Sequence, residues 1–441
     1  MDVSLIIFIV FVALIVLLLI EVPVAFALAG SGTLGLVLLR GPSVAGATLG
    51  SVPFNSSASF TLIVVPMFIL MGIFAMHGRI ADDLFRLTNR LMRGVRGGVA
   101  IATVVTCAGF SAVCGSSVAT AATVGRLTIA EMTRYGFNPA FAAAIVASAG
   151  TLGVLIPPSI ALVLFGVITN ESIGKLLIAG IVPGILSALV MGAGILVFAR
   201  LGIGFDRSIP EIVDRDDGPE AGHYGGVFKL LILFVIIIGG IYSGLITATE
   251  AAAIGALAAL IIMVASAVRN GKGVMRELFD ALRDSASITS MVFAIMIGAA
   301  IFSFFIVSAG IPSAFAGWVI GFDLPPGLLV LLLLMTLIPL GMFLDGVSIL
   351  LITVPLFYPV VVTELGYDGL WYAILTVKMI ELGLITPPVG VNAFIVANMV
   401  KGAELDKVFR NLGVFILLDL IIFMILFAFP ILTTWLPASV N

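Results

Sequence analysis

Charged residues, cysteine and histidine are all scarce in this sequence. Of its 441 residues only 10% are Asp, Glu, Lys or Arg, and there are two cysteines and two histidines. Two cysteines are too few for a disulfide framework, and the apolar surroundings of Cys107 and Cys114 favour inert thiols. The net charge of -3 offers no excess of basic side chains, so we expect no nucleic-acid partner.

The usual catalytic motifs are absent as well. His77 and His223 lie in polar stretches without metal-ligand spacing, and the sequence has neither a His-Glu-x-x-His motif nor a Walker-type phosphate loop. We therefore expect a protein that is not an enzyme and that does not use ATP directly.

Apolar residues make up 61% of the chain. Many runs approach the roughly 20 residues of a membrane-spanning helix, which predicts an all-α polytopic membrane protein with about 11 transmembrane helices in a lipid bilayer. The run Leu5–Ile20 has no basic segment before it and no cleavage site after it, so it indicates a retained span rather than a signal peptide. The predicted spans are 4–20, 22–40, 60–77, 138–169, 176–200, 228–246, 249–268, 286–308, 371–399 and 411–434.

Two of these spans contain paired prolines. Thr151–Ile160 reads Thr-Leu-Gly-Val-Leu-Ile-Pro-Pro-Ser-Ile, and Leu382–Gly390 reads Leu-Gly-Leu-Ile-Thr-Pro-Pro-Val-Gly. Prolines remove backbone donors and disfavour helix at the residue before them. In lipid such a break is tolerated only where the freed carbonyls face protein or water. Matching breaks in two halves are typical of transporter binding sites, so we predict broken helices over 138–169 and 371–399.

Two further segments are predicted to enter the membrane and turn back. In the first, apolar arms of about 15 residues, or roughly 22 Å of helix, flank small and hydroxyl residues, whereas the hydrocarbon core is about 30 Å thick. In the second, arms at Pro325–Leu340 and Ser348–Val362 flank the tip Gly341–Gly346. Ordinary short helices or one kinked span are the alternative. The predicted re-entrant hairpins are 97–125 and 325–362.

A polar stretch, residues 204–227, divides the chain into the halves 1–203 and 228–441. With the N-terminus outside, all of the 21 basic residues except Arg40, Lys175 and Lys378 fall on the cytoplasmic side. This bias predicts a cytoplasmic linker and periplasmic N- and C-termini. It also predicts that the two halves face opposite ways, which is the architecture of inverted repeats.

An amphipathic segment precedes the first hairpin. Ile80, Leu84, Leu87, Leu91 and Val95 recur every three or four residues, and Asp and Arg occupy the opposite face. We predict a surface helix over 79–96. It is either an interfacial arm that carries a moving domain or a plain helix of a cytoplasmic loop.

Ionisable residues at membrane depth are functional candidates by default. Asp345 lies at the second hairpin tip, where its carboxylate can face a cation or the substrate cavity. Lys378 and Glu381 are three residues apart on a broken helix, a spacing that favours an internal ion pair over a role in gating.

Unwound helices and hydroxyl-rich tips supply the oxygen ligands that hard cations prefer, so we expect one sodium site in each half. The first combines the Ser111 and Ser116 side chains with carbonyls at the first break. The second combines the tip of the second hairpin with the second break. The predicted sodium ligands are Ser111, Ser116, Gly153, Ile156, Pro158, Gly341, Asp345, Gly383, Thr386 and Pro387.

Three motifs carry a family resemblance. Cys114–Arg126, Ala149–Ile160 and Thr386–Asn392 resemble, in order and spacing, the large membrane subunit of tripartite ATP-independent periplasmic (TRAP) transporters. The resemblance implies an elevator-type ion-transporter-like fold and sodium-coupled uptake of an organic acid anion across the bacterial inner membrane. C4-dicarboxylates and sialic acid are examples of such anions. The substrate path that it implies is lined by Ser116, Ser117, Ser159, Asp345 and Asn392.

The same resemblance implies two or more Na⁺ as coupling ions and two separate partner chains. These partners are a small four-helix membrane subunit and a periplasmic substrate-binding protein. An ion channel would need a continuous polar lining or a relay of ionisable residues, which this sequence does not offer. A self-sufficient sodium/dicarboxylate symporter of related fold remains the alternative, and it would need neither partner.

Overall fold

The computed structural model describes residues 2–205, 225–400 and 404–439. Within these ranges every regular element is a helix, and the one β-bridge pairs Phe137 with Phe205. The expected all-α polytopic fold is therefore confirmed. Most of the predicted linker, including Arg207, Arg215 and His223, lies outside the described residues, as does Lys401.

Seven helices of the described part are long and apolar enough to cross a membrane, or eight if one bent pair counts as a span. One of the seven, Gly346–Glu364, is an arm of the second predicted hairpin. Two 17-residue helices, α1 (Val3–Leu19) and α2 (Val24–Arg40), fall just short of the required length, and the second broken helix also lies outside this count. We count the bent pair as one span, leave out the hairpin arm, and add α1, α2 and the second broken helix. This gives ten candidate crossings in the described part of the chain.

The number of crossings also decides on which sides the termini lie. An even number places both termini on one side of the membrane, as the positive charges predict. Eleven crossings would put the termini on opposite sides, so the expected count of eleven is incompatible with the expected orientation. Ten crossings, with both termini periplasmic, is the prediction that remains consistent.

The order of elements in the first half begins with spans and leads to a hairpin and a broken helix. The elements, in order, are α1, α2, α3 (Pro42–Ser57), η1 (Phe60–Ile63), α4 (Val64–His77), α5 (Ile80–Leu91), α6 (Gly98–Cys114), α7 (Ser117–Arg134), α8 (Pro139–Gly150), α9 (Leu152–Leu155), α10 (Ile160–Thr169), α11 (Ile173–Ala179) and α12 (Ile181–Leu201).

From α16 onward the second half repeats this order: a long helix, a short helix, a hairpin, a broken helix and a final long helix. The opposite orientation of the halves stays a prediction. The elements are α13 (Gly225–Phe234), η2 (Val235–Gly239), α14 (Gly240–Tyr242), α15 (Ala248–Arg269), α16 (Val274–Ser308), α17 (Ile311–Ile320), α18 (Pro326–Met335), α19 (Leu337–Gly341), α20 (Gly346–Tyr358), η3 (Pro359–Glu364), α21 (Gly369–Leu384), α22 (Val391–Ala397), α23 (Leu405–Ala428) and α24 (Ile431–Ala438).

Both predicted helix breaks are present. The first helix pair, Pro139–Leu155 and Ile160–Thr169, bends by 41° across a gap of four residues. In the second, α21 ends at Leu384 and α22 begins at Val391. The helices of the two predicted hairpins lie close to the expected residues, except that α7 continues to Arg134 instead of ending near Gly125. That they enter the membrane and turn back stays a prediction. Gly125 lies inside α7, where it packs against Val146 rather than forming a turn.

One group of helices packs through small residues. A Cβ atom on Gly32 of α2 would lie 2.7 Å from Phe302 Cα of α16, so these two backbones are in direct contact. Helix α16 also packs against α4. His77 ends α4 rather than lying in a polar loop as expected, and its Nδ1 is 2.8 Å from Glu277 Oε2 of α16.

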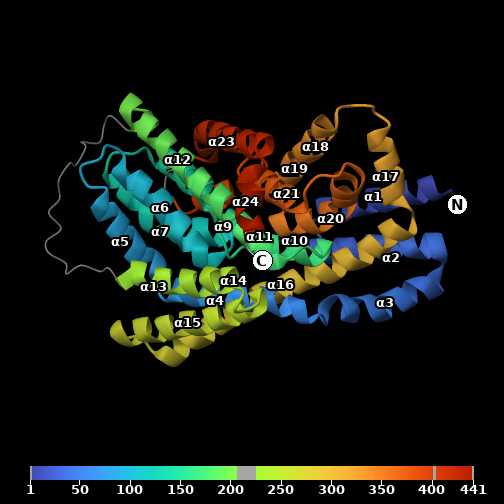
Figure 1. The fold of residues 1–441 in the computed structure, drawn as a ribbon, viewed down its shortest axis with the longest axis horizontal. Helices are drawn as coiled ribbons and strands as arrows, with labels where there is room; N and C mark the ends of the chain where they lie inside the picture. The colour runs from blue at the N-terminus through green and yellow to red at the C-terminus, as the bar shows by residue number, and fades with distance from the viewer. Residues whose placement is uncertain (1, 206–224, 401–403, 440–441) are drawn as a thin grey trace.

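The hairpins and broken helices pack mainly on one another. Helix α8 contacts α6, α7, α22 and α23, while α21 contacts α9, α10, α19 and α20. In Figure 1 the labels of α9, α10, α21 and α24 lie near the centre, between the first hairpin (α6, α7) and the second (α18 to α20). The first helix break, between α9 and α10, and helix α21 therefore lie between the two hairpins in this view.

The amphipathic segment is shorter than expected. Helix α5 covers only Ile80–Leu91, and its buried face comprises Ile80, Ala81, Leu84, Phe85 and Thr88. The expected apolar stripe continued through Leu91 and Val95, but these side chains are 66% and 43% exposed. Leu91 is the last residue of the helix, and Val95 lies beyond it, where the chain turns at Gly94 and Gly97, both with positive φ.

Candidate functional site

The first hairpin tip is in direct contact with the first helix break. The backbone N–H of Ile160 donates to the carbonyl oxygen of Gly115 at 3.3 Å. Gly115 has φ +67°, and a Cβ atom there would lie 2.6 Å from the carbonyl oxygen of Pro158. A Cβ atom on Gly153 would lie 2.8 Å from the carbonyl oxygen of Ser116. Glycine at both positions allows two irregular backbone segments to touch.

Two serines of the predicted first site cap the helices that begin there. Ser116 precedes α7, and its side chain accepts a hydrogen bond from Ala119 N at 3.4 Å. Ser159 precedes α10 and accepts from Leu162 N at 3.2 Å. Ser111 lies in the last turn of α6, where its hydroxyl donates to Cys107 O at 2.5 Å. The predicted serines are therefore close to the junction, each with one hydrogen bond to its own helix.

The second hairpin tip contacts the second broken helix in the same way. A Cβ atom on Gly341 would lie 2.7 Å from Gly383 Cα, so α19 and α21 meet backbone to backbone. Beyond Gly383 the helix ends, and Thr386 Oγ1 donates to Leu382 O at 2.6 Å. Gly341, Gly383 and Thr386 thus lie at one junction, as Ser116, Gly153 and Pro158 lie at the first.

Asp345 has a local structural role that the sequence did not indicate. It is the N-cap of α20, and its Oδ1 accepts hydrogen bonds from Val347 N and Ser348 N, both at 3.0 Å. Its Oδ2 accepts from the Ser348 hydroxyl. This carboxylate fixes the direction in which the second arm of the hairpin begins.

The expected ion pair between Lys378 and Glu381 is not formed. Lys378 Nζ instead lies 2.5 Å from Asp419 Oδ1 of α23. Glu381 Oε1 accepts a hydrogen bond from Ser117 Oγ of α7 at 3.1 Å. The spacing of three residues suggested a local pair, but both side chains found partners on other helices. Asp419, in the middle of the last long span, was not singled out from the sequence.

Asn392 is fully buried, and within the described chain neither its Oδ1 nor its Nδ2 has a hydrogen-bond partner. The same is true of Thr120 Oγ1 and Ser148 Oγ. These residues belong to α22, α7 and α8, which pack against one another. Unpaired polar atoms in a membrane interior are costly, so they indicate a place where solute or water binds. Sequence reasoning missed Thr120 and Ser148, although Thr120 lies one helical turn after Ser116.

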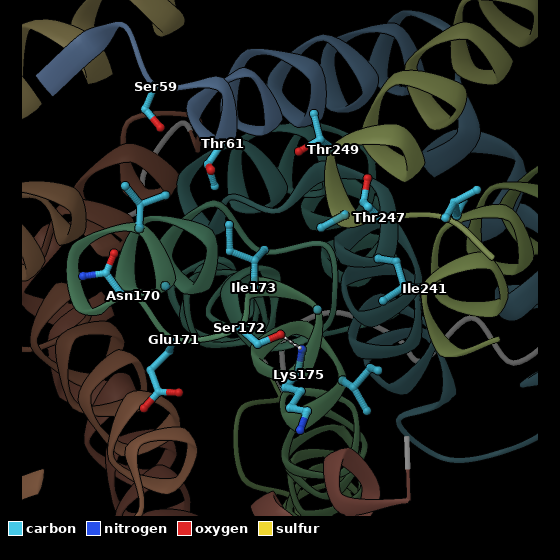
Figure 2. A pocket seen from close by; sticks show the side chains of 16 residues that line it. Ser59, Thr61, Asn170, Glu171, Ser172, Ile173, Lys175, Ile241, Thr247 and Thr249 are labelled. Atoms are coloured by element: carbon cyan, nitrogen blue, oxygen red, sulfur yellow. Dashed lines mark hydrogen bonds between the residues drawn. The ribbon is translucent and has the colours of Figure 1, made fainter. Parts of the chain in front are cut away.

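A separate cavity of about 560 Å³ lies near the loop between α10 and α11. Figure 2 shows its polar lining, which comes from η1 (Thr61), from the α10–α11 loop (Asn170 and Glu171) and from the start of α15 (Thr247 and Thr249). Glu171 Oε1 accepts a hydrogen bond from Tyr358 OH at 2.6 Å. None of the predicted sodium or substrate residues lines this cavity.

Some helices end at the two junctions and others begin there, and these two kinds of helix terminus carry opposite partial charges. Helices α6, α9 and α21 end there, and the negative ends of their dipoles attract cations. Helices α7 and α10 begin there and present backbone N–H groups, which attract anions. Among the described residues no group of three His, Cys, Asp or Glu side chains could hold a metal ion.

Solved transporter structures share this fold. The YdaH transporter of Alcanivorax borkumensis superposes with a TM-score of 0.62 at 14% sequence identity, covering 88% of this chain and 89% of that one. MtrF of Neisseria gonorrhoeae gives a TM-score of 0.60 at 16% identity, covering 89% and 85%. At these identities the likeness concerns the fold alone.

Sequence relatives agree on one family. The C4-dicarboxylate TRAP transporter large permease protein DctM of Pseudomonas aeruginosa is 38% identical over 410 residues, which is 92% of this chain and 91% of that protein. The protein of the same name from Vibrio cholerae is 32% identical over 97% of this chain and 96% of its own length. The family model for the DctM component of tripartite ATP-independent periplasmic transporters matches residues 11–432. The chain belongs to this family, as the large membrane subunit of a TRAP transporter in the bacterial inner membrane.

Proposed function

We propose that this subunit couples the entry of sodium ions to the uptake of an organic acid anion and that it moves the anion by an elevator mechanism. The observation that carries the proposal is the contact of each hairpin tip with a helix break: Gly115 with Pro158 and Ile160, and Gly341 with Gly383. Each contact places the carbonyl end of one helix beside the start of another. Such junctions are typical ion and substrate sites of secondary transporters.

The two sodium sites are assigned to these junctions. Carbonyl groups of Gly153, Ile156 and Pro158 and the hydroxyls of Ser111 and Ser116 would form the first site. Gly341, Asp345, Gly383, Thr386 and Pro387 would form the second. Sodium compensates the negative helix ends and allows an anionic solute to bind nearby. Without the cation, anion and carbonyl groups would repel each other in a low-dielectric surrounding.

The solute is assigned to the starts of α7 and α10 and to the unpaired polar atoms beside them. Ser116 and Ser159 cap these helices, and an organic carboxylate can accept hydrogen bonds from such helix starts. Asn392, buried and unpaired on α22, adds both a donor and an acceptor. The relatives from P. aeruginosa and V. cholerae are named for C4-dicarboxylates, which supports an acid of this class.

The packing supports movement of one group of helices against the other. Hairpins and broken helices contact one another, and α2, α4, α15 and α16 form a second group that touches the first where α4 meets α6 and α10 and where α16 meets α20. Two short helices, α5 and α17, connect the long helices α4 and α16 to the hairpins. In an elevator mechanism they would act as arms, while the hairpin group carries solute and sodium across the membrane together.

Two partners belong to the proposal: a periplasmic protein that delivers the acid and a small membrane subunit. A relative from Oleidesulfovibrio alaskensis, named isethionate TRAP transporter permease protein DctMQ, matches this chain over only 64% of its own length. The remaining part of that relative leaves room for a fused small subunit.

Reconstitution in liposomes tests this function. The chain is inserted alone or with the small subunit, and uptake of the acid that stabilises the binding protein is measured under inward sodium or potassium gradients. We expect uptake only with the sodium gradient, the small subunit and the binding protein together. Uptake by the chain alone would favour the self-sufficient symporter, and equal uptake in both gradients would refute sodium coupling.

A further inference from the structure

One buried hydrogen bond connects the two halves of the protein between the proposed sodium sites. Ser117 Oγ of α7 donates to Glu381 Oε1 of α21 at 3.1 Å, although the residues are 264 positions apart in the sequence. The two side chains are only 4% and 3% exposed. Ser117 directly follows the Ser116 cap, and Glu381 lies in the last two turns of α21, just before Gly383.

The bond is not easily replaced. Lys378, the nearest cation along α21, is already paired with Asp419. Glu381 Oε2 has no partner among the described residues. If the start of α7 moved away from α21, the carboxyl group would lose the hydrogen bond from Ser117 while it stays buried, which is costly. The position of the start of α7 at the first junction therefore constrains the position of the last turns of α21 at the second.

We infer that the Ser117–Glu381 hydrogen bond makes sodium binding at the two junctions cooperative. A cation in the first site orders the hairpin tip at Ser116, and the bond transmits this order to the last turns of α21. The carbonyl of Gly383 is then already in place when the second cation arrives, so its binding requires less ordering. Ser117 and Glu381 are positioning residues in this role. The inference rests on the proposed sodium coupling.

Coupling between two sites is reciprocal, and its typical size is a 5- to 150-fold change in affinity. Each cation therefore strengthens binding of the other to the same degree. Removing the bond leaves both sodium sites in place but makes them independent. This separates a positioning role from a merely structural one, because loss of stability alone would not change the steepness of sodium binding.

The test is a sodium titration of the thermal unfolding temperature of the purified full-length chain, with choline keeping the ionic strength constant. The unfolding temperature of wild type should rise with the sodium concentration along a curve whose Hill coefficient is above one. In Ser117→Ala and in Glu381→Met the Hill coefficient should fall to about one, and the half-saturating sodium concentration should rise by roughly 5-fold or more.

Two further variants make the result specific. Glu381→Gln keeps an oxygen acceptor for Ser117, so it should retain the steep response. Tyr358→Phe removes another hydrogen bond between the halves, from Tyr358 OH to Glu171 Oε1 at 2.6 Å, which lies away from both junctions. This control should leave the sodium response unchanged. If Glu381→Met does not fold, Ser117→Ala decides the matter.

The possible failures can be told apart. A wild-type protein whose unfolding temperature does not respond to sodium would refute the proposed sodium coupling and this inference with it. A wild type that responds with a Hill coefficient of one, or a Ser117→Ala variant as steep as wild type, would refute only the cooperative role. A Tyr358→Phe variant that loses steepness would show that the effect is not specific to this bond.

Discussion

Lys378 and Asp419 form an ion pair inside the membrane region, with Lys378 Nζ 2.5 Å from Asp419 Oδ1 and the two side chains 2% and 1% exposed. The pair joins α21, which carries the second helix break, to α23. Two opposite charges in such a place are tolerable only together, because each alone would lack solvation.

Asp419→Ala should therefore lower the free energy of unfolding by about 3–5 kcal/mol, since it leaves Lys378 buried without a counter-charge. The double variant Lys378→Met with Asp419→Leu removes both charges and should recover most of this loss. Denaturant unfolding in detergent micelles measures both effects. A single variant as stable as wild type, or a double variant no better than the single one, would contradict the role given to the pair.

The sequence predicted the helix breaks well but not this pair. Paired prolines act locally, so Pro157 and Pro387 indicated where α9 and α21 end without any knowledge of the fold. The partner of Lys378 depends on which helix packs beside α21. Glu381, three residues away, was the nearest candidate in sequence, whereas Asp419 lies 41 residues further on.

Local turn chemistry was also recognised only in part. The tips of the two hairpins, within 97–125 and at Gly341–Gly346, were predicted from their small residues, and a helix ends and another begins at each tip. Helix α3 was missed because Pro42–Ser57 has no long apolar run and contains Pro53. The N-cap role of Asp345 was hidden behind its more obvious value as a buried charge. Thr120 and Ser148 have no pattern of their own, and only the burial of their hydroxyls draws attention to them.

Asp345 has two separable contributions. Asp345→Asn keeps an oxygen for the N–H groups of Val347 and Ser348, so its stability should stay close to that of wild type, while its sodium affinity should fall. Asp345→Ala should in addition lose about 1 kcal/mol of stability because the helix cap is gone. Denaturant unfolding and sodium titration of both variants check this. If Asp345→Asn binds sodium with the same affinity as wild type, Asp345 acts only as a helix cap and not as a sodium ligand.

The close contact of α19 with α21 predicts a strong effect of a single methyl group. Gly341→Ala places a Cβ atom against the backbone at Gly383 and should cost about 1–3 kcal/mol through overpacking. Gly192→Ala is the matched control, because no atom lies within 4 Å of its added Cβ. This control should be neutral or stabilise the protein by up to about 1 kcal/mol through helix propensity. Similar losses in both variants would contradict the proposed contact.

The orientation of the chain can be tested with thiol reagents. Cys107 and Cys114 are buried and free, so the native protein should resist a membrane-impermeant maleimide. Asp2→Cys should be labelled in spheroplasts if the N-terminus is periplasmic, whereas Arg93→Cys should be labelled only after the membrane is opened. The reverse pattern would invert the predicted topology.

The central claim is that each junction of a hairpin tip with a helix break binds one sodium ion. Equilibrium binding of radioactive sodium to the purified chain, with choline as the competing salt, tests it most directly. Gly153→Ala should disturb only the first junction and Gly341→Ala only the second. We predict two saturable sodium ions per wild-type chain and one in each variant. Absence of saturable binding to wild type, or the same number of ions in all three proteins, would contradict the claim.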